Sequence, residues 1–190
     1  MFFDDFKILA LVAQLIGLIA MMFSIISYQS KQRKCIILFQ ILSNVMWVVQ
    51  YLLFNEYSAL VVNFIGIARN AVYLLGHKNK IAESKLVPLF AILLFVTFGI
   101  ITYETPIDVL PVLAMCFSSI TFFLKEEQAI RVLSFFVVIP WLIFSAHVGS
   151  IGGVISEVFN TVSIVVAICR FKKHSTIKFV ENSLSQKSKA

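Results

Sequence analysis

Two pairs of side chains suited to holding a polar molecule have the same spacing in two distant parts of the chain. Trp47 precedes Asn63 by sixteen residues, and Trp141 precedes Glu157 by the same interval. Indole rings stack against flat molecules, an amide both donates and accepts hydrogen bonds, and a carboxyl group binds a cation or exchanges a proton. The pattern predicts a polar site made from two similar halves.

Further polar side chains share helix faces with these four. Asn70 lies seven residues after Asn63, and Asn160 lies three residues after Glu157, which are helical spacings. The predicted substrate-binding residues are Trp47, Asn63, Asn70, Trp141, Glu157 and Asn160. Charged groups in apolar helices are costly, so Arg69 and Glu157 are predicted to couple ions or protons. We expect Glu157 to be the most function-sensitive residue.

The same residues also have a structural interpretation. Asparagine and serine in membrane helices often bond to neighbouring helices, and tryptophan collects at the membrane–water interface. Arg69 and Glu157 could form a structural ion pair. Arg69 lies about six residues deeper than Glu157, or about 9 Å along a helix, so a direct pair requires both side chains to extend.

Long apolar stretches must position these residues. Hydrophobic residues make up 59% of the 190 residues and charged residues only 14%, too few to cover a soluble globule. A membrane-spanning helix needs about 20 apolar residues, and the continuous apolarity argues against barrel strands. The seven predicted spans are Ile8–Ser27, Cys35–Phe54, Ser58–Leu75, Leu86–Thr102, Val109–Leu124, Ile130–Ala146 and Ile151–Cys169. The fifth and sixth are predicted to be the shortest.

Charged residues between the spans predict the orientation. One side carries 14 of the 16 lysines and arginines, whereas the other carries acidic residues and one base, Lys7. The positive-inside rule makes the basic side cytoplasmic, with the N-terminus outside and the C-terminus inside. Since the basic charge follows membrane topology, we expect no nucleic-acid partner. The acidic N-terminal flank favours a retained first helix over a cleaved signal peptide.

A shift of 94 residues aligns the first three spans with the last three without a gap, placing Trp47 on Trp141 and Lys31 on Lys125. Because an odd number of spans restores the direction, this predicts two parallel three-helix repeats, an arrangement known among transporters. The predicted fold is an all-α membrane protein with seven transmembrane helices in a 3+1+3 order. Its divisions are 1–76 for the first three-helix repeat, 77–105 for a cytoplasmic loop and linker helix, 106–172 for the second three-helix repeat, and 173–190 for a basic cytoplasmic tail.

Sequence patterns typical of catalysis, metal binding or disulfides are missing. Cys35, Cys116 and Cys169 lie in apolar stretches without CxxC spacing and are predicted to be small buried hydrophobes. The three histidines are isolated, which argues against a shared metal site. The spans contain no Ser/His/Asp set, HExxH motif or paired aspartates. We therefore expect no enzyme activity, no cofactor and no metal.

Several motifs resemble those of a bacterial inner-membrane family, the YgjV family. They are the run Ser27-Tyr28-Gln29-Ser30-Lys31, Trp47 with Tyr51-Leu52-Leu53, Val62-Asn63 with Ala68-Arg69-Asn70, and the segment from Gly149 to Asn160. The resemblance covers nearly the whole chain apart from the charged tail. It implies an inner-membrane location and brings no activity with it.

The 3+1+3 layout is more distantly similar to the SWEET and PQ-loop transporters. Those proteins place a tryptophan on the second helix and an asparagine on the third helix of each triple, around a sugar site. Trp47 and Asn63 match this pattern, and Trp141 matches it in the second triple. Glu157 stands where the second asparagine is expected, a departure that argues against a neutral sugar.

Three classes of function follow from these observations. The first is a small-solute carrier for a sugar-like or other polar metabolite, with a site between the two repeats. The alternative is a membrane scaffold or interaction protein without transport activity, which would have a closed, dry axis. The third is an intramembrane enzyme. The lipid bilayer is an expected partner, a small polar solute is a further one, and a homo-oligomer is left open.

Overall fold

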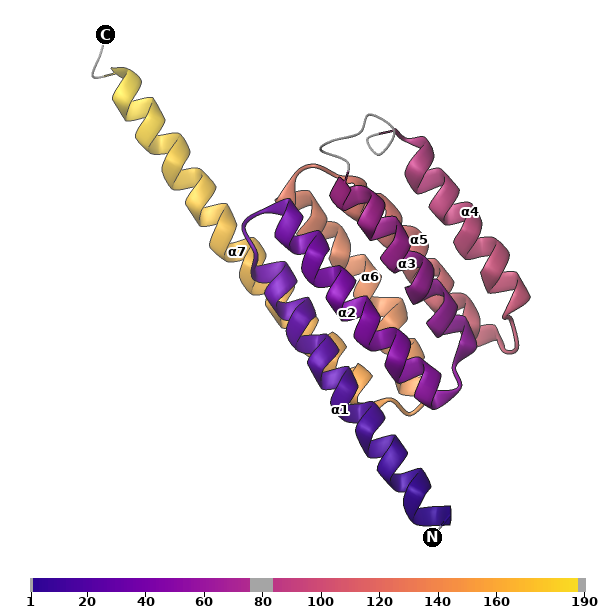
Figure 1. Cartoon of the computed structure of the whole chain (residues 1–190). Coiled ribbons are helices and arrows are strands. Elements are labelled where there is room, and N and C mark those ends of the chain that lie inside the picture. Colours follow the sequence, from indigo (N-terminus) through magenta and orange to yellow (C-terminus); the bar gives the residue numbers. More distant parts are fainter. Residues whose placement is uncertain (1, 76–83, 188–190) are drawn as a thin grey trace.

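A computed structural model describes residues 2–75 and 84–187, with side chains from 9 to 75 and from 84 to 171 (Figure 1). The elements are α1 (Phe2–Gln29), α2 (Arg33–Phe54), α3 (Tyr57–Leu75), α4 (Leu86–Ile101), the 3-10 turn η2 (Pro106–Asp108), α5 (Val109–Phe123), α6 (Glu127–His147) and α7 (Ile151–Lys187). Every regular element in these ranges is helical, which confirms the predicted all-α class. Most of the loop predicted after the third span, at 76–83, lies outside the described residues.

In the part of the chain that the structure describes, six helices are long and apolar enough to cross a membrane. They cover Leu9–Gln29, Arg33–Phe54, Tyr57–Leu75, Pro106–Phe123, Glu127–His147 and Ile151–Phe171. Helix α4 is apolar but has only 16 residues, about 24 Å of helix against a hydrocarbon core of about 30 Å. The prediction that the sixth span is among the shortest is wrong, since α6 has 21 residues. Its first turn carries Glu127, Gln128 and Arg131, so apolarity alone begins the span too late.

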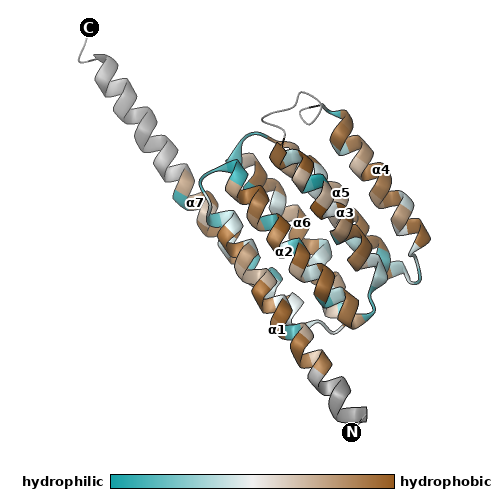
Figure 2. Cartoon of the chain, in the orientation of Figure 1, coloured by the Kyte–Doolittle hydropathy of each residue, from teal (hydrophilic) through white to brown (hydrophobic). Residues whose placement is uncertain are grey.

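The distribution of side chains is the reverse of that in a soluble protein. Large apolar residues are exposed on the outer surface, among them Leu11, Phe64 and Val158, and the outer helices are hydrophobic along their length (Figure 2). Asn, Gln, Ser and charged side chains are buried between the helices. An apolar exterior around a polar interior is the arrangement expected for helices surrounded by lipid.

The helices pack as a six-membered ring with α4 outside it. Around the ring, α1 contacts α2, α2 contacts α3, α3 contacts α5, α5 contacts α6, α6 contacts α7, and α7 returns to α1. Helix α4 packs on α3 and α5. All odd-numbered helices run in one direction (Figure 1), so the ring has two seams between parallel helices, α3–α5 and α7–α1.

Two of the loops end their helices with the same backbone geometry. Asn55 after α2 has a φ of 58°, and Gly149 after α6 has a φ of 69°. Asparagine and glycine tolerate this left-handed conformation best. In both loops the next residue donates its backbone N–H to a carbonyl five residues upstream, over 3.0 Å and 2.9 Å. Asn55 and Gly149 lie 94 residues apart, so the local structure follows the shift found in the sequence.

Small residues let α1 and α7 approach closely at one parallel seam. A Cβ atom on Gly152 would lie 3.0 Å from the backbone oxygen of Gln14, too close for an ordinary side chain. The Gly152 N–H donates to Oε1 of Gln14 over 2.6 Å, and the Ser156 hydroxyl lies 3.4 Å from the Gly17 carbonyl oxygen. Short side chains and interhelical hydrogen bonds are the usual means of helix association in lipid.

Two arginines bind helix ends across the ring. Arg33 of α2 donates to the carbonyl oxygens of Phe122 and Leu124 at the end of α5, over 2.8 Å and 2.7 Å. Arg131 of α6 donates to two carbonyl oxygens at the end of α1, over 3.1 Å and 2.6 Å. The final carbonyls of a helix lack intrahelical partners and carry partial negative charge, which a guanidinium satisfies. We call Arg33 and Arg131 the capping arginines.

Candidate functional site

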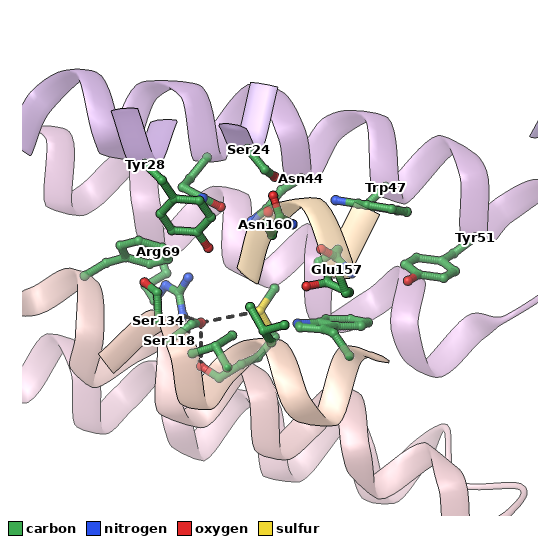
Figure 3. Close-up of a pocket in the computed structure, with 17 residues that line it drawn as sticks. Ser24, Tyr28, Asn44, Trp47, Tyr51, Arg69, Ser118, Ser134, Glu157 and Asn160 are labelled. Carbon is green, nitrogen blue, oxygen red and sulfur yellow. Dashed lines mark hydrogen bonds between the residues drawn. The ribbon is translucent and has the colours of Figure 1, made fainter. Parts of the chain in front are cut away.

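A polar cavity lies at the centre of the ring (Figure 3). Its volume is about 60 Å³, several times the roughly 10–15 Å³ that one water molecule needs. All six helices of the ring line it, and α4 does not. The polar and aromatic lining residues are Ser24, Tyr28, Gln40, Asn44, Trp47, Tyr51, Asn63, Arg69, Ser118, Phe122, Ser134, Trp141, Glu157 and Asn160.

Six of the seven predicted site residues line this central cavity. They are Trp47, Asn63, Arg69, Trp141, Glu157 and Asn160. Asn70 does not line it: its side chain is fully buried, and its Oδ1 accepts hydrogen bonds from Nε and Nη2 of Arg69 over 3.1 Å and 3.0 Å. Asn70 therefore holds Arg69 in place. The binding roles of all seven residues stay predictions.

The two predicted tryptophans lie inside the bundle, with Tyr51 between them. The Tyr51 ring centroid is 5.8 Å from that of Trp47 and 5.9 Å from that of Trp141, at interplanar angles of 23° and 15°. Phe144 packs edge-on against Tyr51, with its centroid 5.9 Å away. We call Trp47, Tyr51, Trp141 and Phe144 the aromatic cluster. Because Tyr51 stacks on both tryptophans, a solute cannot be sandwiched directly between the two indoles without displacing it.

Arg69 is surrounded by neutral groups. Its Nη1 donates to the hydroxyls of Ser118 and Ser119 over 2.6 Å and 2.9 Å and to the Met115 carbonyl over 3.1 Å. The guanidinium carbon also lies 5.5, 5.7 and 5.9 Å from the centroids of three aromatic rings, within the range of cation–π attraction. Among the described side chains, no carboxylate forms an ion pair with Arg69.

Glu157 occupies a different part of the central cavity. Its side chain is 8% exposed and lies beside the Asn160 amide. Figure 3 places Glu157 toward Trp47, away from Arg69 and Ser118. No arginine or lysine within 9–75 and 84–171 forms an ion pair with Glu157, so the structure does not support the Arg69–Glu157 ion pair considered from the sequence.

Two buried side-chain amides in the lining each have one polar atom without a hydrogen-bond partner. Gln40 is 7% exposed and Asn160 is 4% exposed. Nε2 of Gln40 and Oδ1 of Asn160 have no hydrogen-bond partner among the residues that the structure describes. An unsatisfied buried polar atom costs about 1–3 kcal/mol, so the central cavity favours a polar occupant that supplies the missing bonds.

The predicted site omitted several residues of the lining. Gln40, Asn44 and Tyr51 share a helix face with Trp47, at spacings of three and four residues, and extending that stripe would have included them. Tyr28 and Ser134 had no such signal, because each is an isolated polar residue whose direction depends on how α1 and α6 rotate in the bundle.

A second cavity of about 230 Å³ lies at the end of the ring that holds the two left-handed loops. We call it the acidic vestibule, and its lining includes Glu56, Glu104, Asp108 and His147. Asp108 is held by the Ser58 hydroxyl at 2.9 Å and the Thr105 N–H at 2.7 Å. Phe144 lines the vestibule and contacts Tyr51, which lines the central cavity. These two rings therefore separate the two cavities.

The acidic vestibule makes stability depend on pH through Glu56. Burial raises the pKa of the Glu56 carboxyl, the carboxylates of Asp108 and Glu104 raise it further, and His147 lowers it. The folded state therefore disfavours ionised Glu56, a penalty absent below the ordinary glutamate pKa of about 4.3 and complete above the raised pKa. We expect Glu56→Gln to be as stable as the wild type in acid and slightly more stable at neutral pH. Melting temperatures in detergent test this, and a difference that does not change with pH would contradict it.

Comparison with known proteins agrees with the resemblance seen in the sequence. No curated protein and no solved structure gives a significant match. The family model Imp-YgjV, described as a bacterial inner membrane protein, matches residues 11–175. That range contains every residue of the central cavity, all of α2 to α6 and most of α1 and α7. The chain is therefore a multi-pass protein of the bacterial inner membrane, in contact with lipid, and it belongs to the Imp-YgjV family.

Proposed function

We propose that this protein is a carrier for a small polar solute, which binds in the central cavity. The observation that supports this most is a polar cavity lined by all six ring helices, where a scaffold would have a dry, closed axis. The unpartnered amides of Gln40 and Asn160 suit a polar solute. The proposal includes no catalytic step, cofactor or metal.

The carrier is proposed to consist of two three-helix repeats, α1–α3 and α5–α7, with α4 as the linker. Backbone bonds recur at the 94-residue shift: the Ile36 N–H binds the Gln32 carbonyl, and the Ile130 N–H binds the Glu126 carbonyl. The ring order supports the same division, because exchanging the two triples exchanges the α3–α5 seam with the α7–α1 seam. A site between two parallel repeats is a known transporter design.

The orientation forms part of the proposal. The positive-inside rule assigns the end of the bundle with the capping arginines to the cytoplasm, and the acidic vestibule to the outside. The N-terminus is then outside and the C-terminus cytoplasmic. The solute would enter through the vestibule and pass Phe144 and Tyr51 to reach the central cavity. The capping arginines would close the cytoplasmic end.

A membrane scaffold is the second candidate, and the interhelical hydrogen bonds favour it. The hydroxyls of Ser24 and Ser43 lie 2.8 Å apart, and Gln50 donates to Ser150 over 3.0 Å. Such bonds hold helices together without any ligand. They account for many buried polar side chains, but not for the unpartnered atoms of Gln40 and Asn160.

The carrier proposal is tested by solute-dependent thermal stabilisation of the purified protein, followed by uptake into proteoliposomes. A solute that binds the folded state at one hundred times its Kd adds about 2.7 kcal/mol of stability. We expect at least one small polar solute to raise the melting temperature and to accumulate inside the vesicles. Asn63→Ala should weaken the affinity for this solute about tenfold, the loss of one hydrogen bond of about 1.4 kcal/mol, and should therefore reduce both the stabilisation and the uptake.

Phe64→Ala is the matched control. Phe64 lies one residue from Asn63, on the outer face of α3 and away from the central cavity. It should leave solute affinity unchanged. Stabilisation by no member of a broad solute library, with uptake equal to that of empty vesicles, would favour the scaffold.

A further inference from the structure

Two ionisable residues of opposite sign, Arg69 and Glu157, line the central cavity and are not paired with each other. Arg69 has neutral partners, and Glu157 lies beside a neutral amide. Figure 3 shows them in different parts of the cavity. Removing an ion from water is expensive unless an opposite charge or several hydrogen bonds compensate it. A solute with both charges would supply a counter-charge to each residue at once.

The surroundings of the two residues indicate which end of such a solute each one would hold. Figure 3 shows Glu157 on the side of the cavity that holds Trp47, and Trp47, Tyr51 and Trp141 all line the cavity. Tryptophan faces attract ammonium groups more strongly than other aromatic rings do. The Glu157 end therefore combines a carboxyl group with rings that favour a cation.

The Arg69 end suits an anion. A guanidinium has five N–H donors. Nε and one N–H of Nη2 bind Asn70, and Nη1 binds Ser118, Ser119 and Met115. One N–H of Nη2 has no partner among the described residues, and Arg69 lines the cavity. A carboxylate could accept this bond while compensating the positive charge.

We propose that the solute is a compact zwitterion of the α-amino-acid class. Its carboxylate lies toward Arg69, and its ammonium group lies toward Glu157, at the end of the cavity that Trp47 and Trp141 line with Tyr51 still stacked between them. The cavity volume of about 60 Å³ corresponds to about four to six water molecules, which suits the six non-hydrogen atoms of alanine better than the twelve of a hexose. A neutral sugar would bring no opposite charge to either Arg69 or Glu157. This inference rests on the proposed function, because it names the class of solute for the same site.

Three isosteric probes test the inference on the purified full-length chain. Alanine carries both charges, propionate lacks the ammonium group, and alaninamide lacks the carboxylate. We expect alanine to raise the melting temperature, and each analogue to bind at least about tenfold more weakly, because sites built for a polar group reject ligands without it. Glycine and serine should bind as alanine does, and glucose should not bind.

The variant Glu157→Gln assigns the ammonium end. It should weaken alanine binding at least about tenfold and leave propionate binding unchanged, because only alanine presents a cation to this position. Phe64→Leu, on the lipid-facing side of α3, is the control and should change neither. If Glu157→Gln does not fold, the wild-type comparison of alanine with propionate still decides the matter.

The outcomes separate the two proposals. Binding and uptake of a neutral or singly charged solute, without binding of any small amino acid, would overturn the zwitterion and leave the carrier standing. Equal binding of alanine, propionate and alaninamide would also overturn it. Stabilisation by none of these probes would overturn the zwitterion, and stabilisation by no member of the broad solute library, without uptake, would overturn the carrier as well.

Discussion

Replacing Glu157 by glutamine is expected to slow solute uptake into proteoliposomes at least about tenfold and to remove its dependence on pH. Glutamine keeps the shape of the side chain but cannot titrate. Losing a hydrogen bond to a charged group costs about 1.5–3 kcal/mol, which corresponds to about tenfold or more in rate. Arg69, Tyr28 and Tyr51 also line the central cavity. Arginine and tyrosine ordinarily titrate well above neutral pH, so Glu157 is the group of the lining whose proton exchange we propose to be coupled to uptake.

A vestibule variant and a folding assay complete this experiment. Glu104→Gln removes a carboxylate from the acidic vestibule but not from the central cavity, so uptake by this variant should keep the wild-type pH dependence. Retained pH dependence in Glu157→Gln would rule out the proton-coupling role. A Glu157→Gln protein that no longer elutes as a folded species would indicate a structural role for Glu157.

Replacing Phe144 by alanine is expected to join the acidic vestibule to the central cavity. Phe144 is fully buried and lines the vestibule, and its ring packs against Tyr51 and Trp141. Truncating a buried phenylalanine costs about 3–5 kcal/mol and leaves space behind. Ser24 lines the central cavity. A cysteine introduced there by Ser24→Cys should react with a membrane-impermeant thiol reagent, added from the vestibule side, at least about tenfold faster in the Phe144→Ala protein than with Phe144 present.

The labelling requires a background without native thiols and a matched truncation. Cys35, Cys116 and Cys169 are replaced by alanine in all variants. Phe136→Ala removes an equal ring from the exposed side of the same helix and should leave labelling at the wild-type rate. If Phe144→Ala is too unstable to purify, Phe144→Leu removes less volume and should give a smaller increase. Unchanged labelling in a folded Phe144 variant would show that this ring does not separate the cavities.

The spans were predictable because lipid imposes a simple rule: each crossing needs a continuous apolar stretch of sufficient length. This rule did not predict where the spanning helices begin and end. Helix α6 begins at Glu127, before apolarity sets in, and its Arg131 is buried on the carbonyls of α1, a partner about a hundred residues away. Hydropathy also does not show that α4 would be a short helix outside the ring.

The residues of the central cavity were predictable as far as helix faces and the repeat could place them. Trp47 and Trp141, which the 94-residue shift places on each other, both line one cavity. Asn70 was predicted to belong to the site but does not line the cavity. It shares a helix face with Asn63, and its side chain bonds to the neighbouring Arg69. Arg69 bonds to residues of α5, and Tyr51 of α2 stacks against Trp141 of α6. Spacing within one helix does not determine such contacts between helices.

The closely packed α1–α7 seam has a consequence for how the protein is made. Helix α1 is the first helix synthesised and α7 the last, yet they are neighbours in the ring. Until α7 is inserted, the side chain of Gln14 lacks the Gly152 N–H, and Gln50 on α2 lacks the hydroxyl of Ser150. Chains emerge from the ribosome at about 5–20 residues per second, and unsatisfied polar groups in lipid are costly. The nascent chain therefore spends several seconds as an open arc, in which Gln14 and Gln50 still lack these two partners.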